Sequence, residues 1–189
     1  MKAPEQTLRA LDADGWVHTG DMAREDEDGF FYIKGRLKEL IVTAGGENIP
    51  PIYIENSIIE LCPSISNIIV IGDKRKFLSC LITLKCQSDA QGEPTNELGT
   101  IPLKQSQALG SSATTTQEVI EDPKWKEYID SVIDRYNKEK AISNAQQIRK
   151  WTLLEKDMSV SGGELTATMK LKRSVVHKHY STIIEKMYE

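Results

Sequence analysis

The stretch GRLKELIVTAGGENIPP, residues 35–51, marks a change from short strands and turns to longer alternating elements. Gly45 and Gly46 permit positive φ and a close approach of a ligand to the backbone. A tight turn alone would also explain this pair of glycines. Pro50 and Pro51 suit an extended segment that leads into a helix, and the following residues, IYIENSIIEL, are apolar at helical spacing.

The two sides of this stretch have different patterns. On its N-terminal side, residues 15–25 and 29–36 are typical of short strands around the turn DEDG. On its C-terminal side, apolar runs predict central strands at 67–73 and 77–86 and a last strand at 148–155. Because strands and helices alternate after residue 39, we expect a small α/β or α+β domain.

Two helices are predicted in the second half of the chain. The clearer one covers residues 121–141, where Asp122 suits the cap and Pro123 the first turn. Its apolar face is expected to consist of Trp125, Tyr128, Ile129, Val132, Ile133 and Tyr136. The other is a final amphipathic helix within residues 170–189. Its buried stripe is expected to consist of Leu171, Val175, Val176, Ile183, Ile184 and Met187.

Residues 87–112 show neither the helical nor the strand period of apolar residues. Gly, Pro, Asn and Ser are scattered through them, which predicts a long surface insertion at about 87–120. Residues 110–120 have the composition of a phosphate-binding loop but lack its Gly-Lys-Ser/Thr ending. A capping box at the start of a short helix is the better interpretation. It would be formed by Thr115 and Glu118, or by Thr114 and Gln117.

The composition excludes several classes of protein. A net charge of −4, with 39% hydrophobic and 28% charged residues, fits a globular domain and argues against a general nucleic-acid binder. Cys62, Cys80 and Cys86 form no CxxC pair, so we expect no disulfide framework or zinc site, and a reducing cytosolic setting. No apolar run approaches the ~18 residues that span a bilayer, and the N-terminus lacks the apolar core of a signal peptide.

Polar residues in the first strands are candidates for nucleotide binding. Asp21 directly follows Gly20, so its carboxylate can lie on an exposed bend and accept two sugar hydroxyls. A hairpin cap is the favoured interpretation of Asp21 from these residues alone. Arg36 ends the second strand and can form charge-assisted bonds to a phosphate or a ribose. His18 is isolated from other candidate ligands, so we interpret it as packed or hydrogen-bonded.

The stretch SGGELTATMKLKRS, residues 161–174, carries three cations. Lys172 and Arg173, together with Lys178, fit the polar face of the final helix. Lys170 lies just before the buried stripe and can project from the helix entry, where a cation opposes the helix dipole. The periodicity alone leaves open whether Lys170 is a catalytic residue or a surface charge.

Three motifs together resemble those of the adenylate-forming superfamily, which includes acyl-CoA synthetases, luciferases and peptide-synthetase adenylation domains. They are DGWVHTGD at 14–21, GRLKELIVTAGGENIPPIYIE at 35–55 and GGELTATMKLKR at 162–173, in the family's order. The resemblance covers nearly the whole chain. The GGEN-PP form, the insertion after LITLKC and the TMKLKR ending are most similar to eukaryotic long-chain acyl-CoA synthetases of the bubblegum subfamily.

The resemblance implies an α+β fold with two parts. Residues 38–189 match the mobile C-terminal lid domain, a short central sheet flanked by helices. Residues 1–37 match the tail of the large AMP-binding domain, a β-hairpin remnant. The implied function is that of the C-terminal portion of a long-chain fatty acid–CoA ligase, which adenylates a fatty acid and then transfers the acyl group to CoA. Since the phosphate loop and substrate pockets of the large domain are missing, we expect the isolated chain to be inactive.

The resemblance also implies roles for single residues. Asp21 matches the residue that binds the ribose hydroxyls, and Arg36 matches a contact to the ribose or phosphate. Lys38 occupies the hinge about which the lid domain swings between the two steps. Lys170 matches the lysine that bridges the carboxylate and phosphate oxygens during adenylation.

The substrates implied are a fatty acid, ATP with Mg²⁺, and CoA, reached through the missing large domain. Gly45 and Gly46 match the segment that lines the path of the pantetheine arm. Some short-chain relatives have a basic contact to the CoA phosphate where this chain has Glu47, so we expect no such contact here. We expect no metal ligands, no tightly bound cofactor and no nucleic-acid partner.

An alternative is a non-catalytic module that binds a partner protein or an anionic membrane. The final helix combines its apolar stripe with Lys172, Arg173, Lys178 and Lys186, as interfacial helices do. Packing of this helix on its own sheet is the favoured interpretation. We expect a cytoplasmic location, with the question of peripheral contact to the endoplasmic reticulum or another membrane left open.

Overall fold

Two strands, β5 (Ile65–Ile71) and β6 (Leu78–Leu84), form the centre of the computed structural model, which describes residues 7, 8 and 10–189. They pair antiparallel, and β9 (Ile148–Leu153) joins the other edge of β6 in parallel. Every residue of β6 is buried, which explains why its sequence is a continuous run rather than an alternating one.

The remaining strands of the described residues form three antiparallel pairs. These are β1 (Asp21–Glu25) with β2 (Phe31–Arg36), β3 (Ile41–Val42) with β4 (Asn48–Ile49), and β7 (Cys86–Ser88) with β8 (Pro94–Leu98). The helices are α2 (Pro51–Leu61), α3 (Thr100–Ala108), α4 (Thr116–Glu121), α5 (Pro123–Glu139), α6 (Arg173–His179) and α7 (Ser181–Lys186), with 3-10 turns η1 (Leu37–Glu39) and η2 (Asn144–Gln146).

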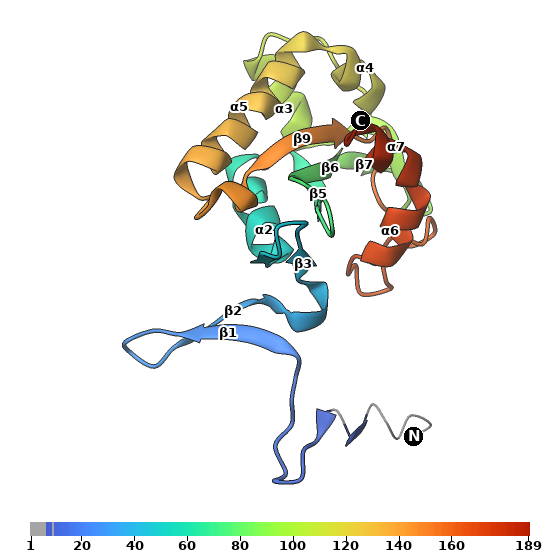
Figure 1. Cartoon of the computed structure of the whole chain (residues 1–189). Coiled ribbons are helices and arrows are strands. Elements are labelled where there is room, and N and C mark those ends of the chain that lie inside the picture. Colours follow the sequence, from blue (N-terminus) through green and yellow to red (C-terminus); the bar gives the residue numbers. More distant parts are fainter. Residues whose placement is uncertain (1–6, 9) are drawn as a thin grey trace.

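Successive residues of β5 face two different hydrophobic cores. Ile68 and Val70 pack with the side of the sheet covered by α2 and α5, whereas Ile69 and Ile71 pack with the side covered by α6 and α7. This follows from the alternation of side chains along a strand. Figure 1 shows the two groups of helices on opposite sides of the sheet and the β1–β2 hairpin beyond α2 and β3.

Several predicted elements are confirmed. Helix α5 begins after Asp122, whose side chain accepts a hydrogen bond from the Lys124 amide at 2.8 Å, and Pro123 occupies its first turn. Thr115 and Glu118 form the capping box of α4. The strands predicted at 67–73, 77–86 and 148–155 are β5, β6 and β9. The α+β class, with a short sheet flanked by helices, is also confirmed.

The segment predicted as a long surface insertion at about 87–120 is largely exposed, but it is more regular than its sequence pattern indicates. The segment forms the β7–β8 hairpin and helix α3, and Leu98 is fully buried in the core with α2 and α5. Leu103 and Leu109 pack against the same core. The apolar residues of segment 87–120 are few and widely spaced, so neither a helical nor a strand period is visible in the sequence.

The expectation of one helix within residues 170–189 is also wrong. Tyr180 has φ −104° and ψ 18°, which separates two short helices, α6 and α7. Of the predicted stripe, Val176, Ile184 and Met187 are buried in the second core, and the other three residues are half-buried. In the stretch 35–51, strand β3 is limited to Ile41–Val42. No helix in the described part of the chain is long and apolar enough to cross a membrane.

Replacing Leu98 with alanine tests whether the insertion belongs to the core. We expect the free energy of unfolding to fall by about 2–5 kcal/mol, because the substitution leaves a cavity in a closed core. The measurement is chemical denaturation followed by circular dichroism. Ile101→Ala, at a half-exposed position in α3, is the control and should change the free energy of unfolding by about 0.5 kcal/mol or less. Equal losses for both variants would contradict this.

Candidate functional site

Asp21 and Arg36 lie opposite each other where β1 begins and β2 ends. The Nε atom of Arg36 donates to Oδ1 of Asp21 at 3.2 Å, so the structure brings these two predicted site residues together. Gly20, with φ +77°, forms the bend that was expected just before Asp21, and the Thr19 hydroxyl caps the Asp21 amide at 3.1 Å. The pair is exposed enough to meet a ligand with both a carboxylate and a guanidinium.

The segment with the predicted hinge residue, Lys38, is the 3-10 turn η1, directly after the β1–β2 hairpin. The Leu37 amide donates to the carbonyl of Gly20 at 2.9 Å, which attaches the start of η1 to the hairpin. Lys38 and Glu39 line a small cleft of about 190 Å³, whose other wall includes Arg173 and His177. The turn therefore connects the hairpin with the body of the domain.

Gly45 and Gly46 lie in the turn between β3 and β4. Gly46 has φ +79°, whereas Gly45 does not adopt positive φ, so only Gly46 needs to be glycine for conformational reasons. A Cβ atom added at Gly45 would meet only the Thr43 hydroxyl, at an ordinary distance of 3.7 Å. The fold of this chain thus does not itself exclude a side chain at Gly45.

Lys170 projects from a closed hairpin rather than from a helix entry. The Thr166 amide donates to the Lys170 carbonyl at 2.8 Å, and the Lys170 amide donates to the Thr166 hydroxyl at 3.0 Å. Met169 has φ +59°, a left-handed conformation that completes the tight turn. Since α6 begins only at Arg173, the expected opposition between Lys170 and the helix dipole does not arise.

The base of this hairpin is attached to α6. The Lys172 amide donates to the Glu164 carbonyl at 2.7 Å, and Glu164 Oε1 lies 3.0 Å from Nδ1 of His179. Burial raises the pKa of Glu164, but hydrogen bonds, chiefly with His179, bring that pKa below its ordinary value. The Lys170 side chain itself is exposed, and its position depends on these backbone and base contacts.

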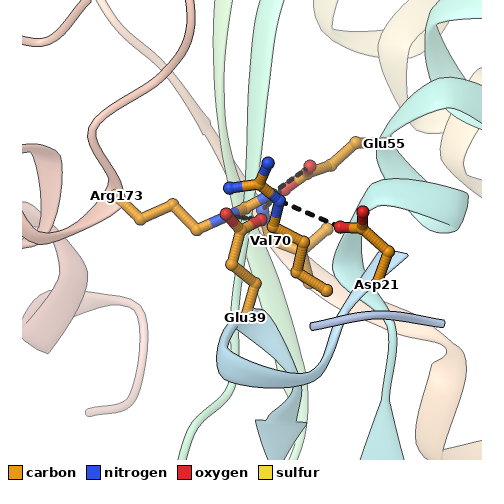
Figure 2. Close-up of polar contacts among 6 residues, drawn as sticks. Asp21, Glu39, Glu55, Val70 and Arg173 are labelled. Atoms are coloured by element: carbon orange, nitrogen blue, oxygen red, sulfur yellow. Dashed lines mark hydrogen bonds and ion pairs between the residues drawn. The ribbon is translucent and has the colours of Figure 1, made fainter. Parts of the chain in front are cut away.

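Arg173 was expected to be an ordinary surface charge, and this is wrong. Its guanidinium donates two hydrogen bonds to the carboxylate of Glu55 in α2, at 2.7 and 2.6 Å (Figure 2). Oε1 of Glu55 also accepts a hydrogen bond from the Val70 amide in β5, at 2.9 Å. The Nε atom of Arg173 lies 3.6 Å from Glu39 in η1.

A signal for this ion pair was present in the sequence. Glu55 follows Ile54 on the apolar face of α2, one turn before Ile58, where a carboxylate has to find a buried partner. The partner is distant in sequence, so only the tertiary structure identifies it as Arg173. His18, interpreted as packed or hydrogen-bonded, lies 3.0 Å from a carboxylate oxygen of Asp12 and is exposed.

The predicted site residues do not form one cluster. Within the described part of the chain, no hydrogen bond or ion pair joins Lys170 to Asp21 or Arg36. The same part of the chain contains no group of three His, Cys, Asp or Glu side chains that could hold a metal ion. What the arrangement offers is an exposed ammonium on one anchored hairpin and a carboxylate–guanidinium pair on another.

Part of the chain matches a known protein family. Residues 38–100 match the family described as the AMP-binding enzyme C-terminal domain. The match begins at Lys38, shortly after the β1–β2 hairpin ends at Arg36.

Long-chain-fatty-acid–CoA ligases are similar to this chain over its whole length. It is 50% identical over 191 residues to ACSBG2 of Gallus gallus, covering 100% of this chain and 25% of that ligase. It is 49% identical over 192 residues to ACSBG1 of Bos taurus, covering 100% of this chain and 26% of that ligase. The chain thus spans about a quarter of the length of these relatives and matches their C-terminal part. The predicted relation to the bubblegum subfamily is confirmed.

Several solved structures share the fold. The adenylation domain of a carboxylate reductase from Mycobacterium chelonae has a TM-score of 0.70 and 21% identity, covering 99% of this chain and 25% of that one. The ATP-bound MatB from Rhodopseudomonas palustris has a TM-score of 0.57 and 19% identity, covering 96% of this chain and 28% of that one. At these identities the likeness concerns the fold alone.

Replacing Asp21 with asparagine tests whether the Asp21–Arg36 pair supports the fold. Because the pair is solvent-exposed, we expect the free energy of unfolding to change by less than about 1 kcal/mol. Chemical denaturation of the 189-residue chain is the measurement. A larger loss would mean that the pair is structural, and it would weaken the case for a ligand-binding role.

Proposed function

We propose that this chain is the mobile C-terminal portion of a long-chain fatty acid–CoA ligase. The observation that carries the proposal is 50% identity over the whole chain to the Gallus gallus ligase. In the proposed reaction, an oxygen of the fatty acid carboxylate attacks the α-phosphorus of ATP, and pyrophosphate leaves. The thiol of CoA then attacks the acyl carbon, AMP leaves, and the thiol proton passes to solvent. Mg²⁺ would arrive with ATP and screen its phosphates.

Lys170 is the proposed catalytic residue of the first step. A carboxylate and a phosphate repel each other, so a positioned ammonium lowers the barrier by interacting with both oxygens as charge develops. The exposed side chain on an anchored hairpin supports this role, since its backbone is held while its ammonium is free to meet an anion from another domain.

Asp21 and Arg36 are the proposed contacts to the nucleotide. The carboxylate would accept the ribose hydroxyls, and the guanidinium would donate to the ribose or a phosphate. The two side chains already lie 3.2 Å apart, which supports their action at one ligand. Lys38 would be the hinge residue, and its place in η1 next to the hairpin supports this.

Gly45 and Gly46 are the proposed lining of the pantetheine path in the second step. The fold tolerates a Cβ atom at Gly45, so a glycine there is better explained by a ligand than by packing. After adenylation, rotation at η1 would withdraw the Lys170 hairpin and bring the β3–β4 turn to the reaction centre.

Residues 1–37 are proposed to belong with a large AMP-binding domain. Trp16, Phe31 and Ile33 are each at least 70% exposed, an arrangement that a larger apolar surface would bury. The alternative function, a membrane- or protein-binding module, loses its main support because the apolar residues of α6 and α7 pack against the sheet. Peripheral membrane contact stays a prediction.

The 189-residue chain alone should make no acyl-CoA from ATP, palmitate and CoA. A chimera in which it replaces the matching C-terminal quarter of the Gallus gallus ligase should restore synthesis. The assay follows acyl-CoA by liquid chromatography, with the unmodified ligase as control. Activity of the isolated chain, or an inactive but folded chimera, would contradict the proposal.

Lys170→Ala in this chimera should slow adenylation by about 10²–10³, the usual effect of removing one donor that stabilises developing charge. Thioester formation from supplied acyl-adenylate should be largely unchanged. Pyrophosphate exchange measures the first half-reaction, and release of AMP from acyl-adenylate and CoA measures the second. Lys172→Ala, two residues away and also exposed, is the matched control. Equal losses in both half-reactions would refute the assigned role.

A further inference from the structure

One ion-pair cluster joins three segments that are far apart in sequence. It contains Arg173 at the start of α6, Glu55 in α2 and Glu39 in η1 (Figure 2). The Glu55 side chain is 9% exposed, that of Arg173 20% and that of Glu39 35%. The cluster therefore has a buried arm, from Arg173 to Glu55, and a half-exposed arm, from Arg173 to Glu39.

The buried arm is fully hydrogen-bonded. Glu55 accepts two bonds from the guanidinium and a third from the Val70 amide. Burial lowers the pKa of Arg173, but the hydrogen bonds to Glu55 and the negative charges of Glu55 and Glu39 together outweigh it, so this pKa lies above the ordinary value. Loss of either partner would leave a buried charge uncompensated, so the two residues hold α6 and α2 together at this point.

Arg173 also fixes one end of the hairpin that carries Lys170. The two residues are separated only by Leu171 and Lys172, and the Lys172 amide already closes the hairpin onto Glu164. A rotation at the start of α6 would therefore move the hairpin as a unit.

The half-exposed arm, from Arg173 to Glu39, ends in η1, the turn that contains the proposed hinge residue. Glu39 belongs to η1 and is adjacent to Lys38, so its 3.6 Å approach to Arg173 depends on the backbone conformation of the turn. Glu55 lies in a helix of the domain body and has no such dependence. Any change in η1 would then alter one arm of the cluster and leave the other in place.

We propose that Arg173 is a positioning residue that orients the Lys170 hairpin through Glu55 and couples it to the hinge through Glu39. This inference rests on the proposed role of Lys170 in adenylation. It differs from a purely stabilising ion pair because it assigns different consequences to the two arms. The buried arm sets the order of the hairpin, and the half-exposed arm sets the balance between the two half-reactions.

Hydrogen exchange of the 189-residue chain tests the buried arm without any enzymatic activity. Arg173→Lys keeps the positive charge but cannot form the bidentate hydrogen bonds to the Glu55 carboxylate. We expect backbone amides of residues 166–172 to exchange about tenfold faster relative to those of β6, because local opening becomes easier. Glu185→Gln, which removes the Arg75–Glu185 ion pair between α7 and the body, is the matched control and should leave this ratio within about twofold. Equal ratios for the two variants would overturn the inference.

The chimera tests the half-exposed arm. Glu39→Gln is nearly isosteric and leaves the buried arm intact, so it should fold with an unchanged melting temperature. We expect the ratio of the adenylation rate to the thioester-forming rate to change about threefold or more, whereas Glu185→Gln should leave that ratio unaltered. An unchanged ratio for Glu39→Gln would overturn the coupling.

The two proposals can fail separately. A folded chimera that forms no acyl-adenylate refutes the ligase proposal and with it the coupling to catalysis. The exchange measurement then decides alone whether Arg173 orders the hairpin. An active chimera in which Arg173→Lys reduces both half-reactions equally, with unaltered hairpin exchange, refutes the positioning role and leaves the ligase proposal standing.

Discussion

The structure depends on covering both faces of the strand pair β5–β6. Because successive side chains of β5 point to opposite faces, neither face can be left to solvent without exposing a row of branched apolar residues. Helices α2 and α5 cover one face, and α6 and α7 cover the other. The last segment of the chain must therefore return to the sheet, and this return brings Arg173, which follows the Lys170 hairpin, next to Glu39 in η1.

A buried carboxylate imposes the second constraint. Glu55 lies on the apolar face of α2 and cannot remain charged there without partners. The Val70 amide and the Arg173 guanidinium supply three hydrogen bonds, from a strand and from a helix far away in sequence. An ion pair of this kind adds little net stability compared with apolar packing, but it specifies one relative arrangement of the elements it joins. That specificity would suit the proposed role of Lys170, which requires its hairpin to be held in a defined direction.

Local patterns predicted part of the fold well. The cap at Asp122, the capping box at Thr115 and the long helix α5 involve contacts within one or two turns, so short-range rules were sufficient. The β7–β8 hairpin and helix α3 were not predicted. Leu98 is buried by residues distant in sequence, and its neighbours show neither a helical nor a strand period. The prediction of a single final helix was wrong because its apolar residues pack against the sheet from two short helices, α6 and α7. A stripe of apolar residues at helical spacing does not show where such a break lies.

The sequence by itself indicated the family resemblance, because the three motifs that carry it are local features of the chain. The predicted site residues Asp21, Arg36, Lys38, Gly45 and Lys170 lie within these motifs. It also determined the central strands and the long helix, because their hydrophobic patterns depend only on spacing. The tertiary structure alone decided that Lys170 lies on a closed hairpin and that Arg173 is bound to Glu55. The Arg173–Glu55 pair depends on groups 118 residues apart meeting in space, and hydrogen bonds over such separations leave no periodic trace in a sequence. The hairpin closes through contacts between Thr166 and Lys170, only four residues apart, which carry no hydrophobic period either.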